Sequence, residues 1–173
     1  MSLAHRGPEF AASAPSALDE IRAASGQGID VASSVTLRLL DGVVDIYMPD
    51  IKYSDGNIAR RLSGAPDYPE VVRSAIREMH RQVGDLILSR SGLARRGLLV
   101  RHLVLPNDLA NTAACMDFLA HEISTDTYVN LMDQYHPAFR SGRRPEVDRR
   151  VTTAEFGTAL EAARVAGLRR IIH

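Results

Sequence analysis

Four apolar segments of strand length divide the chain. β-branched and other aliphatic side chains dominate them, and they cover residues 43–48, 97–106, 127–132 and 169–172. The first segment is an almost continuous apolar run, which is typical of a strand buried on both faces, as in a parallel sheet. A Ser91-Gly92 turn between residues 85–88 and the stretch from Leu93 onward predicts a small hairpin before the second strand.

Amphipathic helical stretches lie between these segments. Asp67-Tyr-Pro-Glu70 suits the first turn of a helix, and apolar residues at helical spacing continue from there to Val83. Thr152-Thr-Ala-Glu155 is a capping box and Gly167 is a stop signal, so a second long helix is predicted between them. Shorter helices are predicted at residues 16–26, 35–40 and 111–122.

The order of these elements predicts the fold class α/β. Strands alternate with helices, and right-handed crossovers between them give a mostly parallel sheet with flanking helices. Three or four strands are too few to close an eight-stranded barrel. Residues 1–15 are rich in Ala, Ser, Pro and Gly without an apolar period, so we expect a disordered leader followed by one domain over residues 16–173.

Charge and composition narrow the classes of function. The 173 residues include 21 basic and 21 acidic side chains, and a net charge near zero gives no general attraction to nucleic acid or anionic lipid. The apolar runs are far shorter than the ~20 residues of a membrane-spanning helix. The first residues lack the apolar core of a signal peptide, and the single Cys115 cannot form an intramolecular disulfide. We therefore expect a cytoplasmic protein without a membrane or nucleic-acid partner.

The first strand carries two candidate site residues at its carboxyl end, where parallel α/β folds place their reacting groups. The period of two puts Met48, Asp50 and Lys52 on one face, so the carboxylate and the ammonium group emerge side by side. Such a pair can bind a zwitterion, ribose hydroxyls or a phosphate. A purely structural ion pair is the alternative.

The next two strands carry three more candidates. Arg101 lies within an apolar strand, where an unpaired arginine is costly. It is either a carboxylate clamp at the strand mouth or the partner of Asp45 or Asp133 on a neighbouring strand. On the third strand, Gln134 and His136 continue one face and form a polar tip. A hydrogen-bonded structural histidine is the alternative for His136.

Other reactive side chains give weaker signals. His80 and His121 lie in predicted helices without the second histidine four residues away that a zinc-binding helix shows, so no metal site is predicted. Cys115 lies in an alanine-rich helix and is expected to pack there rather than act as a nucleophile. The arginine-rich residues 140–150 are expected to form a solvated loop, with docking of an acidic partner as the alternative.

Three stretches together resemble the carboxyl-terminal half of radical S-adenosylmethionine (SAM) proteins related to the pyruvate formate-lyase activating enzymes. They are residues 43–53 (VVDIYMPDIKY), 101–106 (RHLVLP) and 128–137 (YVNLMDQYHP). Residues 61–68, 78–84 and 95–100 are similar to a less characterised branch of that family, and the resemblance covers roughly residues 35–170. It implies a partial (βα) TIM-type barrel with a 4Fe–4S cluster and SAM at the strand mouths.

The resemblance also implies a chemistry and a set of cofactor-binding residues. Reductive cleavage of SAM gives a 5′-deoxyadenosyl radical, which in the activating enzymes abstracts hydrogen from a glycine of a protein substrate. Asp50 and Lys52 match the family's D-x-K strand end near SAM, and His136 matches a histidine after the last barrel strand. Arg101 and Gln134 are expected on the same SAM-binding wall.

The sequence departs from the family at the cluster. The CxxxCxxC motif, whose three thiolates hold the cluster, is absent, and so is the glycine-rich SAM loop. We therefore expect a fragment that is inactive alone, with the missing amino-terminal half or a protein substrate of the glycyl-radical type as its partner. Two other hypotheses stay open: a Schiff-base lyase or aldolase in which a desolvated Lys52 attacks a carbonyl with Asp50 assisting, and a non-catalytic module that forms homo-oligomers through an exposed sheet edge.

Overall fold

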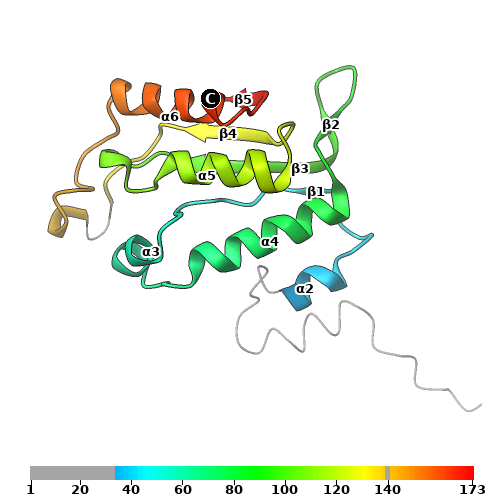
Figure 1. Ribbon diagram of the computed structural model, residues 1–173, viewed down its shortest axis with the longest axis horizontal. Helices are drawn as coiled ribbons and strands as arrows, with labels where there is room; N and C mark the ends of the chain where they lie inside the picture. Colours follow the sequence, from blue (N-terminus) through cyan, green and yellow to red (C-terminus); the bar gives the residue numbers. More distant parts are fainter. Residues whose placement is uncertain (1–33, 139–140) are drawn as a thin grey trace, which may run out of the picture.

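The computed structural model describes residues 34–138 and 141–173 (Figure 1), so the leader predicted at residues 1–15 and the helix predicted at 16–26 lie outside the described residues. The helices and strands are, in chain order, α2 (Ser34–Leu39), β1 (Ile46–Tyr47), α3 (Gly56–Ser63), α4 (Tyr68–Val83), β2 (Ile87–Leu88), β3 (Ala94–Leu103), α5 (Thr112–Phe118), β4 (Tyr128–Met132), α6 (Thr153–Val165) and β5 (Arg170–Ile172). One turn of π-helix, Leu119–Ile123, extends α5, and short 3₁₀ turns lie at Pro106–Asp108 and Ser141–Arg143. The predicted α/β class is confirmed.

The strands form one mostly parallel sheet. Its order is β1-β3-β4-β5, with parallel pairing at each step, and β2 adds an antiparallel hairpin to β3 as predicted. In the part of the chain that the structure describes, the sheet does not close: β1 and β5 lie at its two ends, and β2 pairs on one side only, with β3.

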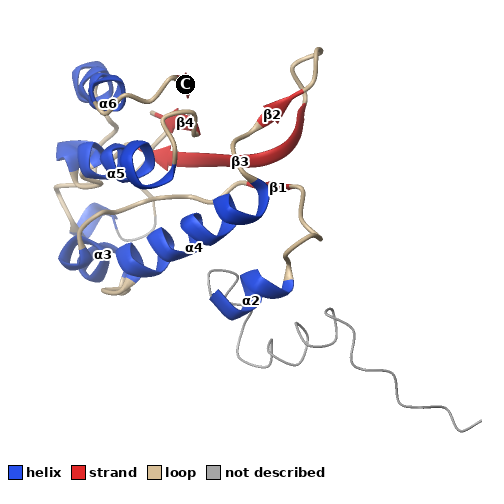
Figure 2. Cartoon of the chain, turned by 45° about the vertical axis from the view of Figure 1, so that its right-hand side comes forward, coloured by secondary structure: helices blue, strands red, loops and turns tan. Residues whose placement is uncertain are grey.

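Helices α4, α5 and α6 cover one face of this sheet (Figures 1 and 2). The strand order runs in one direction through the chain, and each right-handed crossover therefore places its helix on the same side. Leu98, Val100 and Val129 are fully buried beneath the helices, whereas Leu99 and Tyr128 on the other face stay partly exposed. One face of the sheet thus holds the hydrophobic core, and helices α4, α5 and α6 leave the other face uncovered.

The prediction that residues 43–48 form a strand buried on both faces was wrong. β1 has only two residues and lies at the sheet edge, where Val43, Ile46 and Met48 are 68%, 39% and 54% exposed. Tyr47 points the other way, is buried, and donates a hydrogen bond from its hydroxyl to Gln82 Oε1 at 2.8 Å. An apolar run does not distinguish a central strand from an edge strand, because strand order depends on contacts between residues far apart in sequence.

The helices agree with the sequence patterns, with one addition. The helix predicted at residues 35–40 is α2, and α4 ends at Val83 as expected, although the Asp67 side chain makes no capping hydrogen bond. Helix α3 was not predicted, yet its signals are local: Asp55 caps its first turn and Gly64 ends it with a φ of 71°. In the described ranges, no helix has the length and apolar character needed to cross a membrane.

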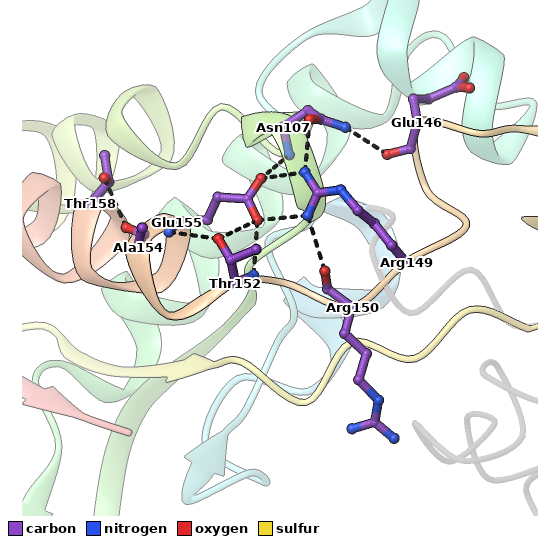
Figure 3. Close-up of polar contacts among 8 residues, drawn as sticks. All are labelled: Asn107, Glu146, Arg149, Arg150, Thr152, Ala154, Glu155 and Thr158. Atoms are coloured by element: carbon purple, nitrogen blue, oxygen red, sulfur yellow. Dashed lines mark hydrogen bonds and ion pairs between the residues drawn. The ribbon is translucent and has the colours of Figure 1, made fainter.

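Glu155 ties the start of α6 to the loop after β3 (Figure 3). The predicted capping box is present, with Glu155 N donating to Thr152 Oγ1 at 3.2 Å and Thr152 N donating to Glu155 Oε2 at 2.9 Å. Arg149 donates two hydrogen bonds to the same carboxylate, at 2.8 and 2.7 Å, and Asn107 N donates a third at 2.7 Å. These hydrogen bonds, that of Arg149 first, hold the pKa of Glu155 well below its usual range. Arg149, predicted to belong to a solvated loop, therefore fastens that loop to the domain.

Replacing Glu155 with alanine is expected to lower the free energy of unfolding by about 2 kcal/mol, since it removes both a helix cap and charge-assisted hydrogen bonds. Urea denaturation measures this change. Glu161→Ala is the matched control, because that carboxylate is 66% exposed and lies 3.9 Å from Arg164. The control should change stability by less than about 0.5 kcal/mol, and equal losses in the two variants would contradict the role given to Glu155.

Candidate functional site

Asp50 lies just beyond β1 and binds two cationic side chains at once. Its Oδ1 accepts a hydrogen bond from Arg101 Nε at 2.7 Å, and its Oδ2 accepts one from Lys52 Nζ at 2.8 Å. Arg101 therefore belongs to the strand mouth, and the alternative that it pairs with Asp45 or Asp133 was wrong. The sequence placed Asp50 and Lys52 on one face, and tertiary structure added Arg101 from 51 residues further along the chain.

The backbone around Asp50 is held from both sides. Toward β3, Arg101 N donates to Pro49 O at 2.9 Å, and Ile51 N donates to Arg101 O at 2.9 Å. Toward the free edge, the Tyr68 hydroxyl donates to the backbone oxygen of Asp50 and accepts from the backbone N–H of Lys52, both at 3.0 Å. Tyr68 thus occupies the position of a neighbouring strand and fixes the segment that carries both side chains.

Sequence reasoning did not select Tyr68 as a site residue. The chain shows only an aromatic residue in the first turn of a helix, and nothing local reveals that its hydroxyl reaches a strand end 16 to 18 residues earlier. Its ring packs edge-on against Tyr53, with 5.7 Å between the ring centroids. Burial raises the pKa of Tyr68 to about 12, so the hydroxyl stays neutral and keeps both of its backbone hydrogen bonds at neutral pH.

The charges of Asp50, Lys52 and Arg101 leave one positive charge in the group. Burial by itself would raise the pKa of Asp50, but the hydrogen bonds and charges of Lys52 and Arg101 lower it below its ordinary value. The three side chains are 28%, 46% and 38% exposed, so a ligand can reach them. Arg101 uses Nε for Asp50, and its terminal nitrogens can donate to an anionic group such as a carboxylate.

The five residues selected from the sequence line one cleft. It has a volume of about 460 Å³ and lies at the carboxyl ends of β1, β3 and β4. The polar lining residues are Asp50, Lys52, Arg101, Gln134 and His136, and the others are Leu103, Met132 and Tyr135. Both Gln134 and His136 are exposed at the rim. A cleft with cations at one end and amide, imidazole and apolar groups at the other suits a ligand with a charged part and a flat polar part.

A second, larger cleft lies on the other side of Asp50. It has a volume of about 830 Å³, and the free edge of β1 and the face of α4 that looks toward it form its walls. Asp50, Lys52 and Arg101 line both clefts, so their charges lie where the two meet.

His102 supports the site from behind and was not selected from the sequence. It is fully buried, with Nδ1 2.8 Å from Ile51 O and Nε2 3.0 Å from Thr112 Oγ1. A carbonyl oxygen can only accept, so Nδ1 carries the hydrogen and Nε2 accepts from the threonine hydroxyl. Burial lowers the pKa of His102 to about 4, so the ring is neutral at neutral pH. It links the Asp50–Lys52 segment to the first turn of α5.

Lys52 is the sole lysine of the sequence. The Schiff-base hypothesis requires a desolvated lysine, whereas this side chain is 46% exposed and holds an ion pair with Asp50. The structure therefore does not favour a Schiff-base lyase or aldolase over a binding role for Lys52.

The remaining reactive side chains occupy other parts of the fold. Cys115 is fully buried, and burial raises its thiol pKa to about 12, so it packs in the core as expected. His80 Nε2 lies 3.0 Å from Asp85, and His121 Nδ1 lies 3.0 Å from Asp117 O. Across residues 34–138 and 141–173, no three His, Cys, Asp or Glu side chains are grouped so that they could hold a metal ion.

Comparisons with known proteins give one relative of unknown function. The chain is 32% identical over 128 residues to an uncharacterized protein of Methanocaldococcus jannaschii, a match that covers 73% of this chain and 33% of that protein. The chain thus spans about a third of the length of this curated relative. No protein-family model and no solved structure matches the chain.

Proposed function

We propose that this chain forms the carboxyl-terminal part of a radical-SAM barrel and supplies one wall of its SAM-binding site. The connections between the strands support this, because a sheet whose crossover helices α4, α5 and α6 lie on one face has the arrangement of a (βα) barrel and not of a doubly wound sheet. The observation that carries the proposal is that Asp50, Lys52, Arg101, Gln134 and His136 line one cleft at the carboxyl ends of parallel strands.

The side chains in that cleft fit the groups of SAM. The amino-acid part of SAM has a carboxylate, which Arg101 and Lys52 can bind, and Asp50 offers an acceptor for an ammonium group or ribose hydroxyls. Gln134 and His136 provide hydrogen-bonding groups at the rim for the ribose or the base. When SAM is bound next to a reduced cluster, it supplies the 5′-deoxyadenosyl radical that abstracts hydrogen from a substrate. In the related activators that hydrogen comes from a protein glycine.

The residues do not fit the cluster. A cluster of this family needs three thiolates, and the sequence has a single cysteine, whose side chain is buried in the core. The ligands of the cluster must therefore come from other polypeptide, and the chain alone should bind SAM weakly without iron. The amino-terminal half of the barrel or a protein substrate is the partner in this proposal.

The lone lysine gives a direct test of SAM binding. Acetic anhydride acetylates Lys52 at a single internal site, which mass spectrometry of the digested protein quantifies with and without millimolar SAM. We expect SAM to slow the acetylation of Lys52, because the ligand occupies the cleft that this side chain lines. Asp50→Asn should weaken this protection about tenfold or more, since it removes the charge of the carboxylate that orients Lys52 and Arg101.

Asp133→Asn is the matched control, because Asp133 is an exposed carboxylate outside the cleft lining. In this variant, SAM should protect Lys52 from acetylation as strongly as it does in the unmodified chain. Equal acetylation of Lys52 with and without SAM would refute the proposed binding wall. Anaerobic incubation with iron and sulfide tests the cluster separately, and a stable iron–sulfur absorbance would contradict the statement that its ligands lie elsewhere.

A further inference from the structure

The hairpin formed by residues 86–97 stands away from the body of the domain (Figures 1 and 2). Its tip is closed by its own hydrogen bonds. Ser89 N donates to Leu93 O at 2.7 Å, Gly92 N donates to Ser89 O at 3.0 Å, and Leu93 N donates to Ser89 Oγ at 3.1 Å. The hairpin therefore presents a preformed surface, which reduces the entropy that a binding partner would have to remove.

Three of the exposed side chains of the hairpin are large and aliphatic. Ile87, Leu88 and Leu93 are 57%, 38% and 69% exposed. These three residues lie within one short protruding element, so exposed apolar side chains are concentrated there, in contrast to single exposed apolar residues scattered over a protein.

The same hairpin concentrates positive charge. Residues 86–97 contain Arg90, Arg95 and Arg96 and no acidic residue, although the whole chain has equal numbers of basic and acidic side chains. Arg96 is partly used by the domain, since it donates to Gln82 O at 2.8 Å and lies 3.7 Å from Asp45. Arg90 and Arg95 are exposed and form no ion pair with any residue that the structure describes.

The backbone of the hairpin adds a third feature. Among the described strands, β2 pairs only with β3, so its outer edge is open to another extended segment. A strand edge flanked by aliphatic side chains and arginines suits an extended peptide that carries both apolar and acidic residues.

We propose that residues 86–97 dock an extended, acidic and aliphatic segment of a protein partner. The backbone of that segment pairs with β2, its aliphatic side chains cover Ile87 and Leu93, and its carboxylates bind Arg90 and Arg95. A nucleic acid fits less well because the hairpin has no aromatic residue to stack on bases. A lipid surface fits less well because three arginines fall short of the cluster of about four to eight that lipid-binding segments carry.

This docking surface is separate from the proposed SAM site. The hairpin lies at the amino end of β3, whereas Arg101 and the cleft lie near its carboxyl end. A partner held there leaves the cleft open, and the inference does not rest on the proposed function.

The test measures binding of a fluorescein-labelled peptide of alternating glutamate and valine to the full chain by fluorescence anisotropy. We expect saturable binding that weakens as salt increases, and at least a tenfold loss of affinity in the double variant Arg90→Glu/Arg95→Glu. Arg150→Glu, which reverses an exposed arginine before α6, should bind as the unmodified chain does. Leu93→Ser tests the apolar contribution and should also weaken binding.

Circular dichroism melting checks that the variants are folded, and we expect unchanged melting because the substituted side chains are exposed. Equal affinity of the double variant and the unmodified chain would overturn the proposal, as would tighter binding of a lysine–valine peptide. Tighter binding to phosphatidylserine vesicles or to single-stranded RNA than to the acidic peptide would overturn the choice of a protein partner.

Discussion

Replacing Gly97 with alanine is expected to destabilise the protein by more than about 3 kcal/mol. Gly97 has a φ of 121°, which L-residues with a side chain rarely adopt. A Cβ at this position would lie 2.4 Å from Asp85 O and 2.5 Å from Leu86 Cα. Both are main-chain atoms, so relief requires movement of the backbone where it crosses β3, and the pairing of Gly97 with Ile46 of β1 would be disturbed as well.

Substitutions at two other glycines separate the two causes of this effect, the positive φ and the close approach of main-chain atoms. Gly92→Ala also imposes a side chain at positive φ, 79°, but nothing lies within 4 Å of the added Cβ, so the cost should be about 1 kcal/mol. Gly157→Ala lies inside α6 with open space around it and should stabilise the protein by about 0.5–1 kcal/mol. Urea denaturation ranks the three variants. A Gly97→Ala variant that is no less stable than Gly92→Ala would show that the close approach to Asp85 is absent.

Acidification from pH 7 to pH 5 is expected to lower the free energy of unfolding by about 2 kcal/mol because of His102. The loss is about 1.4 kcal/mol for each pH unit below the pKa that this histidine has in the unfolded chain. The pKa of this histidine is about 4 in the folded protein, against 6.5 for an unperturbed histidine, because burial disfavours the charged ring. Between these values the unfolded chain binds a proton that the folded chain does not. The contribution of His102 is therefore complete above about pH 6.5 and is lost as the pH falls.

The variant His102→Gln provides the test, since glutamine does not titrate in this range. It is expected to be less stable at pH 7, because the hydrogen bonds to Ile51 O and Thr112 Oγ1 are altered, but its unfolding free energy should lose this part of the pH dependence. His136→Gln replaces an exposed histidine and should retain the full dependence. The pH range stays above the titration of the carboxylates of Asp50 and Glu155, whose pKa values are lowered. An unchanged slope in His102→Gln would refute this assignment.

The two residues that brace the site, Tyr68 and His102, indicate where sequence reasoning stops. Each acts through a hydrogen bond to the segment of Asp50 to Lys52 from a distant part of the chain. A histidine in an apolar strand and a tyrosine at a helix start have many possible roles, and only the approach of the elements selects one. The ion pair between Asp50 and Arg101 has the same origin, since the sequence suggested Asp45 or Asp133 as the partner of that arginine and packing instead chose Asp50, across the parallel pair.

The sequence by itself determined the local features of this protein. Periodicity of two and of 3.6 located the strands and most helices, the capping box located the start of α6, and alternation put Asp50 and Lys52 on one face. Only the tertiary structure decided that residues 43–48 lie at a sheet edge, that helices α4, α5 and α6 share one face, and that five polar side chains meet in one cleft. The physical reason is range: backbone geometry and capping involve neighbouring residues, whereas strand order and the pairing of charges depend on contacts across the whole fold.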